Sequence, residues 1–254
     1  LLKHGTINDL RILTVVLVIM FFLLNSTKYE LMPIKLSNFI KSQMNNKICI
    51  IYVILLCFFS VILAAKTNNG QDFDSLWYML KPEYMLVGEH SFFDYLGYSA
   101  YVFYYPKLVE FFLLPVSGVG DYSFILIGTV FAYNFFIVLT YEFLSEFSKR
   151  EKSSNNLLFI CVLFSVPALT SVAASAKGDV FGAFLSFAGI FFFLKFTKNK
   201  DKTDLLYSII TFALSTGTKL TFLLWGGMAF LIFLIYYVWA NRKGQFCKND
   251  ERVN

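Results

Sequence analysis

The sequence contains few charged residues and few of the side chains on which catalytic and metal sites depend. Charged residues occupy 15% of the 254 positions, and the only two histidines, His4 and His90, stand far apart. Two isolated histidines do not make the ligand set of a zinc site. A glycine-rich phosphate loop and a Ser-His-Asp pattern are also missing, so nothing supports a nucleotide-binding protein or a hydrolase.

The four cysteines have no spacing that indicates a metal site or a disulfide. Cys49, Cys57 and Cys161 lie inside apolar runs, and Cys247 lies in a basic tail. We interpret them as small apolar side chains.

Long apolar runs dominate the sequence instead. Hydrophobic residues make up 57% of the chain and aromatic residues 19%, which leaves too little polar surface to cover a soluble protein. Apolar blocks without strict alternation predict membrane helices rather than barrel strands. We therefore expect an all-α, polytopic membrane helical bundle of about seven spans. The predicted spans are Leu10–Leu24, Ile48–Ala65, Tyr122–Leu144, Leu157–Ala176, Val180–Phe196, Leu205–Gly217 and Leu220–Ala240.

The last two predicted spans leave an alternative open. Leu205–Gly217 is shorter than the roughly 20 residues that a spanning helix needs. The region from Leu205 to Ala240 could therefore be one kinked helix. We prefer a hairpin that turns at Gly217–Lys219, because it leaves Arg242 on the cytoplasmic side.

Basic residues gather in short clusters between the apolar runs, which indicates membrane topology and not a nucleic-acid partner. The four clusters lie within 28–47, 149–152, 195–202 and 242–248. Because cytoplasmic loops are rich in Lys and Arg, we place these clusters in the cytoplasm and the acid-rich loop 66–121 outside.

This orientation divides the chain into three parts. Residues 1–47 form an N-terminal span and a basic cytoplasmic linker, residues 48–240 form a transmembrane module, and residues 241–254 form a basic cytoplasmic tail. The orientation also puts the N-terminus outside, which Lys3 and Arg11 mildly disfavour.

The outer loop 66–121 mixes acids with many aromatic residues. The stretch "QDFDSLWYML" puts Asp72 and Asp74 shortly after the second span. A carboxylate close to the membrane is costly unless it is paired or used. Aromatic density favours short amphipathic helices on the membrane surface over disorder. The Asp-x-Asp spacing is a weak signal for a divalent cation, and the sequence does not require one.

A second short element is expected later in the same loop. Pro106 begins a ten-residue apolar stretch, and Pro115, Gly118 and Gly120 end it. Proline suits a helix start because its missing N–H would have no partner there. The stretch is too short to cross a bilayer, so we expect a helix at the membrane surface or partly inserted.

The order of these segments resembles the bacterial GT-C membrane glycosyltransferases, a class that includes protein O-mannosyltransferases and aminoarabinose transferases. The segments are D-S-L-x-Y at Asp74–Tyr78, the proline-led helix, the turn Gly120–Asp121, "SAKGDVFGAFLSFAGIFFFLKF" and "ALSTGTKLTFLLWG". The resemblance covers roughly Ile48–Ala240. It implies the N-terminal transmembrane module of such an enzyme in the bacterial cytoplasmic membrane.

The resemblance implies transfer of a sugar from a polyprenyl-phosphate donor to an acceptor, not identified by the sequence, at the outer membrane face. A carboxylate would accept the proton of the acceptor hydroxyl, and cations would bind the lipid phosphate. The expected partners are this lipid-linked sugar and membrane lipids. The candidate catalytic residues are Asp74 and Asp72, and the candidate substrate-binding residues are Lys107, Lys177, Asp179, Lys219, Tyr78 and Tyr105.

These residues also have structural interpretations. Asp72 or Asp74 can cap a helix near Ser75, and Asp179 can cap the span that begins at Val180. Lysines at span ends can simply extend toward water.

Two rival functions stay open beside the glycosyltransferase. A lipid-sugar flippase or transporter would have charges midway along its spans and often inverted repeats, and the sequence has neither. A non-catalytic subunit of envelope polysaccharide assembly would need no chemistry of its own.

Overall fold

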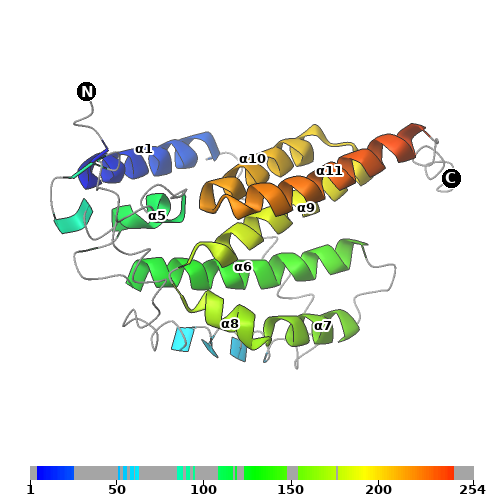
Figure 1. Ribbon diagram of the computed structural model, residues 1–254, viewed down its shortest axis with the longest axis horizontal. Coiled ribbons are helices and arrows are strands. Elements are labelled where there is room, and N and C mark those ends of the chain that lie inside the picture. Colours follow the sequence, from blue (N-terminus) through cyan, green and yellow to red (C-terminus); the bar gives the residue numbers. More distant parts are fainter. Residues whose placement is uncertain are drawn as a thin grey trace. The chain divides into compact units, whose positions relative to one another are not determined.

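The computed structural model is helical in the part of the chain that it describes (Figure 1). Contacts divide the chain into two compact units, Leu1–Val180 and Phe181–Asn254. The division falls within the first turn of helix α9, so we describe that helix with the second unit. The described residues are 5–25, 51, 54–55, 58–59, 61–62, 85–87, 90–91, 94, 108–116, 118, 123–147, 154–175 and 177–242.

Among the residues that the structure describes, three helices are long and apolar enough to cross a membrane. They are α6 (Ser123–Phe147), α9 (Asp179–Asn199) and α11 (Thr221–Arg242). Each of these helices matches a predicted span. The all-α prediction is therefore confirmed for the described residues. The three apolar helices also support the prediction of a membrane protein. The number of about seven spans stays a prediction, because most of Ile48–Ala65 lies outside the described residues.

Helix α1 (Ile7–Asn25) begins with a reciprocal cap that its sequence encodes. The Asp9 carboxylate accepts hydrogen bonds from the Gly5 and Thr6 backbone N–H groups at 2.8 and 3.0 Å, and the Asp9 N–H donates to the Thr6 hydroxyl at 3.4 Å. This is a capping box, which satisfies amide donors that have no partner inside the helix. The helix contains the first predicted span.

The N-terminal end of α1 contacts two segments of the predicted outer loop. Leu10, Met85 and Leu114 are all buried and form one hydrophobic cluster. Beside this cluster, the Arg11 Nε donates to the Pro115 carbonyl at 3.1 Å. The start of α1 and the loop are therefore at the same end of the first unit. The predicted outward orientation of the loop would therefore put the N-terminus outside too, where Arg11 has this contact.

The short helix expected after Pro106 is present as α5 (Leu108–Leu113), followed by the 3-10 helix η2 (Leu114–Val116). Its Leu113 side chain occupies the space beside Gly128 of α6, where an added Cβ atom would overlap it. Helix α5 packs against α6 while η2 packs against α1. The element is thus wedged between two longer helices.

The prediction of one continuous helix over Leu157–Ala176 is wrong. The chain forms α7 (Ser154–Phe164) and α8 (Pro167–Ala173), with a break between them. Proline has no N–H to donate, and it drives the preceding residue out of the helical region. Val166 is accordingly extended, with φ −60° and ψ 122°.

Helix α6 compensates for this break. The Tyr133 hydroxyl donates to the Phe164 carbonyl beside the break. The Thr129 hydroxyl donates to the Ala173 carbonyl, at the far end of α8, at 3.0 Å. The Phe164 ring packs edge-on against Tyr133 and Phe136, at centroid distances of 5.5 and 5.3 Å. A broken helix is tolerated in a membrane when neighbouring groups satisfy the freed carbonyls in this way.

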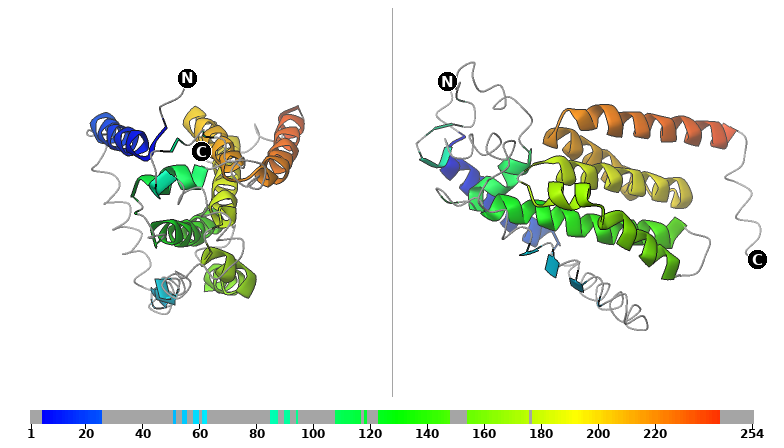
Figure 2. Two further views of the ribbon diagram at one scale, coloured as in Figure 1. Left: turned by 60° about the vertical axis from the view of Figure 1, so that its left-hand side comes forward. Right: turned by 60° about the horizontal axis from the view of Figure 1, so that its bottom comes forward.

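The second unit consists of α9, α10 (Lys202–Thr218) and α11, which lie side by side (Figure 2). Helix α10 ends at Thr218, Lys219 is extended, and α11 begins at Thr221. The predicted hairpin is therefore confirmed, and the alternative of one kinked helix is wrong.

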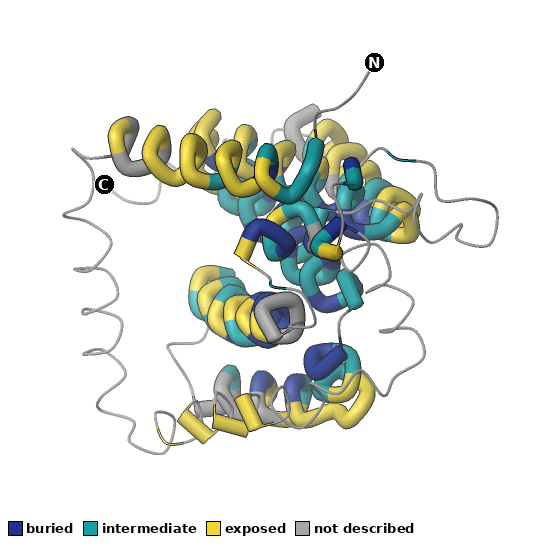
Figure 3. Tube along the Cα trace, turned by 90° about the vertical axis from the view of Figure 1, so that its left-hand side faces the viewer, coloured by how far each residue is buried: buried dark blue, intermediate teal, exposed yellow. Residues whose placement is uncertain are grey.

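One face of α9 forms the seam of this unit. Its residues recur at the 4-3-4-3 spacing of a coiled-coil seam, which keeps them on one face of the helix. They are Gly182, Ser186, Gly189, Phe193 and Phe196. Figure 3 shows the buried residues of the described helices in dark blue and the exposed ones in yellow.

The seam changes from small to large residues along its length. Added Cβ atoms would overlap Thr218 and Phe222 at Gly182, and Phe212 at Gly189. Further along, the Phe193 ring lies 5.3 Å from that of Phe230. We call the end near Gly182 the glycine end and the opposite end the lysine end.

Candidate functional site

The structure describes three of the eight predicted site residues. Lys177, Asp179 and Lys219 are all half-buried. The other five lie outside the described residues: Asp72, Asp74, Tyr78, Tyr105 and Lys107.

Asp179 and Lys219 lie at the glycine end of the second unit. Asp179 is the first residue of α9, one turn before Gly182. Thr218 and Phe222, which flank the turn containing Lys219, both pack against Gly182. An acid in the first turn of a helix is favourable, so the structural interpretation of Asp179 stays open beside the functional one.

The glycine end also collects the amino ends of two long helices. Helices α9 and α11 have 21 and 22 residues, and both begin there. Each helix start carries a partial positive charge, and Lys219 adds a full one. Asp179 already places a carboxylate at the start of α9, so the part of this end that favours an anion such as a phosphate group is the start of α11 with Lys219.

The lysine end gathers the end of α9, the start of α10 and the end of α11. The Lys195 Nζ lies 3.9 Å from Asp204 Oδ1, and the Lys200 Nζ lies 4.5 Å from the centre of the Tyr237 ring. The Asp201 carboxylate caps α10 by accepting from the Thr203 N–H at 2.9 Å, and this bond holds the pKa of Asp201 below its usual value. The basic cluster 195–202 and the start of the tail thus share one end, as the orientation requires.

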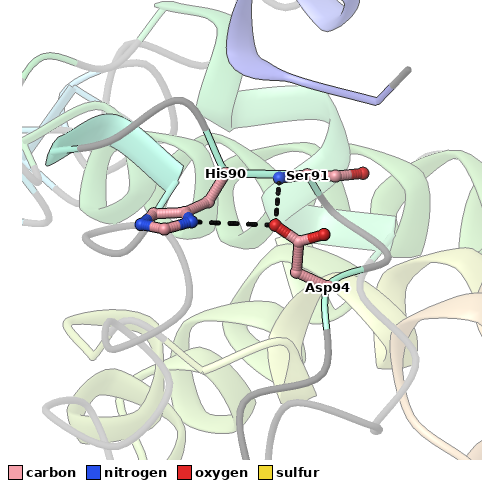
Figure 4. Close-up of polar contacts among 3 residues, drawn as sticks. All are labelled: His90, Ser91 and Asp94. Atoms are coloured by element: carbon pink, nitrogen blue, oxygen red, sulfur yellow. Dashed lines mark hydrogen bonds and ion pairs between the residues drawn. The ribbon is translucent and has the colours of Figure 1, made fainter. Parts of the chain in front are cut away.

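A polar turn in the predicted outer loop was missed by sequence reasoning (Figure 4). The Asp94 Oδ2 accepts from the Ser91 N–H at 2.8 Å and lies 3.7 Å from the His90 Nδ1. The Asp94 N–H donates to the Ser91 carbonyl at 3.1 Å. Ser91 and Asp94 have the S-x-x-D spacing of a capping box, which is the signal that could have found the turn. The turn fixes the local course of the loop, and Ser91 is buried in it.

The charged residues of the longer helices avoid the middle of each helix. In α1, α6, α9, α10 and α11, each charged residue lies within the first two or the last two turns. Among the described residues, no three His, Cys, Asp or Glu side chains come together as a metal site would require.

Comparison of the chain with protein-family models, with curated proteins and with solved structures gave no match.

Proposed function

We propose that this chain is an integral membrane glycosyltransferase that moves a sugar from a polyprenyl-phosphate donor to an acceptor hydroxyl at the outer face of the membrane. The observation that carries the proposal is the distribution of charge in the second unit. Asp179 and Lys219 lie at the glycine end, beside two helix starts, while the lysine cluster lies at the opposite end. An anionic lipid-phosphate group suits the first of these ends.

The proposed reaction is a displacement at the anomeric carbon. The acceptor oxygen forms a bond to this carbon while the bond from the carbon to the phosphate oxygen breaks, and polyprenyl phosphate leaves. The acceptor proton passes to a carboxylate, for which Asp74 and Asp72 are the candidates. Lys219 and the helix starts stabilise the negative charge on the departing phosphate. Lys107, Lys177, Tyr78 and Tyr105 are the further candidates for holding the donor.

The positions of charges favour this function over the transporter alternative. A transporter binds its substrate near the middle of the membrane and places polar groups there. The charges of the described long helices lie in their end turns, where a reaction at the membrane surface would use them.

Donor turnover by purified protein in vesicles tests the proposal. The donors are radiolabelled polyprenyl-phosphate hexoses and aminopentoses, and the variants are Asp72→Asn, Asp74→Asn and Lys219→Gln. We expect one aspartate variant to lose about 10²–10⁴-fold of the turnover, because a general base contributes about that much. Lys219→Gln should lose less, since the helix starts remain.

Matched variants from the predicted cytoplasmic side are the controls. Asp201→Asn and Lys152→Gln repeat the same charge changes away from the proposed site and should keep full turnover. Full turnover in both Asp72→Asn and Asp74→Asn would remove the base assignment. If the parent protein turns over none of the donors, the non-catalytic subunit becomes the better hypothesis.

Cysteine labelling from outside the cell tests the orientation separately. A His90→Cys variant, without the four native cysteines, suits this experiment because the His90 side chain is 43% exposed. Ser91 is a poor position, since only 6% of it is exposed. The proposal expects labelling of residue 90 by a membrane-impermeant maleimide. Labelling only after the membrane is opened would reverse the orientation and remove the outer-face site.

A further inference from the structure

The turn between α9 and α10 carries more lysines than acids. Asp201 caps α10, and Asp204 pairs with Lys195. Three further lysines, at positions 198, 200 and 202, are exposed at the same turn. The turn therefore presents a cationic surface, made by Lys198, Lys200 and Lys202.

The backbone fixes one of these cations at a defined place. Lys200 has φ 59°, a left-handed conformation that non-glycine residues rarely adopt, and its N–H donates to the Phe196 carbonyl at 2.8 Å. Its ammonium lies over the Tyr237 ring and 3.4 Å from the Tyr237 hydroxyl. The charge is thereby held against α11 instead of extending freely into water.

The neighbouring part of α11 has the pattern of a membrane interface. Tyr236 and Trp239 are 55% and 47% exposed, and their rings lie 6.3 Å apart. Tyrosine and tryptophan favour the depth of lipid headgroups. Before them on the same helix, Leu231, Ile232 and Ile235 are exposed and apolar, as a surface facing acyl chains would be.

We propose that the lysine end binds an anionic phospholipid, with the headgroup phosphate on Lys198, Lys200 and Lys202 and the acyl chains along the exposed face of α11. Charge complementarity argues for this occupant, because the cationic surface adjoins interfacial aromatic residues and then an apolar helix face. A topology signal alone needs positive charge anywhere in the loop. The contact of Lys200 with Tyr237 instead holds the cation beside the surface that the lipid would cover. The inference does not depend on the proposed glycosyl transfer.

Fluorescence quenching by brominated lipids tests this site directly. The chain has three tryptophans, so a Trp77→Phe, Trp225→Phe variant reports only on Trp239. It is reconstituted in phosphatidylcholine vesicles that contain either brominated phosphatidylglycerol or brominated phosphatidylcholine. We expect the anionic lipid to be preferred at Trp239. Each neutralised lysine should lower the preference up to about fivefold, the factor that corresponds to about 1 kcal/mol per basic residue.

A second single-tryptophan protein provides the matched control. A Trp77→Phe, Trp239→Phe variant reports on Trp225, which is 71% exposed near the glycine end of α11. Both leaflets have the same composition, so a general attraction to anionic lipid would appear at both tryptophans. The proposal expects a clear preference at Trp239 and a much smaller one at Trp225.

The outcomes are distinct. The Lys198→Gln, Lys200→Gln, Lys202→Gln variant, checked for folding by circular dichroism, should show no preference at Trp239. High salt should remove the preference of the parent protein without any substitution. Equal preference at both tryptophans, or a preference that the triple variant keeps, would overturn the proposal. Loss of the preference with inorganic phosphate at matched ionic strength would show a site for free phosphate instead of lipid.

Discussion

The two ends of the second unit use the same seam of α9 in opposite ways. At the glycine end the seam consists of Gly182, Ser186 and Gly189, and neighbouring side chains occupy the space that the glycines leave. At the lysine end it consists of Phe193 and Phe196, whose rings meet aromatic residues of α11. Small residues let helix backbones approach closely, whereas rings fill a wider space. Helix packing at the glycine end depends on glycines that have no side chain, and helix packing at the lysine end depends on aromatic rings.

Removing a ring from the lysine end should have the largest effect on stability. Phe193 is 1% exposed, and its ring contacts those of Phe230 and Tyr237. Phe193→Ala should lower the free energy of unfolding by about 3–5 kcal/mol, the range for phenylalanine truncation in a packed core. Unfolding in mixed detergent micelles measures the change.

The control for this prediction is Leu231→Ala on the exposed face of α11. Leu231 is exposed, so its truncation leaves no cavity and should cost much less. Equal losses for Phe193→Ala and Leu231→Ala would mean that the aromatic contacts do not hold the three helices together.

Adding a side chain at the glycine end should have the next largest effect. In Gly182→Val the new atoms would overlap both Phe222 and Thr218. We expect a loss of about 1–3 kcal/mol, as for other insertions into a packed interior. The same unfolding experiment measures it.

Gly227→Val on α11 is the matched control for this substitution. A Cβ atom at Gly227 would meet nothing within 4 Å, so no overlap is expected there. Replacing a helical glycine also removes an intrinsic cost of about 1 kcal/mol relative to alanine. Gly227→Val should therefore be close to neutral. A loss as large as that of Gly182→Val would count against close packing at the glycine end.

The sequence predicts those parts of this fold that depend on local signals. Long apolar runs predict α6, α9 and α11, because a run of this length has few alternatives to a helix in lipid. The hairpin before Thr221 followed from the distribution of basic residues. The short helix after Pro106 followed from its proline and its length.

The break between α7 and α8 is a feature that apolar runs alone do not predict. Pro167 is visible in the sequence, but the apolar run continues through it and was taken as one span. Whether a proline bends or breaks a membrane helix depends on what satisfies the freed carbonyls. Here the Phe164 carbonyl is satisfied by the Tyr133 hydroxyl, which is 31 residues away in the chain.

The seam of α9 was missed for a different reason. Its 4-3-4-3 pattern joins glycines, a serine and phenylalanines, which differ in hydropathy but share one face. A search for apolar residues alone does not find such a pattern. The candidate acids Asp72 and Asp74 stay a prediction, because they lie outside the described residues. The sequence alone does not place side chains in so long a loop, since distant contacts such as that of Leu10 with Met85 help to set its course.

Acidification should weaken the cap at the lysine end, and this is the smallest effect that we expect. The bond from the Thr203 N–H lowers the pKa of Asp201 in the folded protein below the usual 3.8. Because the folded pKa is lowered, the ionised cap stabilises the protein fully above the unfolded pKa of 3.8. This stabilisation is lost as the pH falls through the folded pKa. On acidification, the melting temperature of the parent protein should therefore fall toward that of Asp201→Asn, because the asparagine keeps a capping oxygen but has no charge to lose. Melting temperatures of the two proteins, from about pH 6 to below 3.8, measure the difference, which should shrink on acidification. A difference that stays constant or grows would mean that the charge of Asp201 does not stabilise the start of α10.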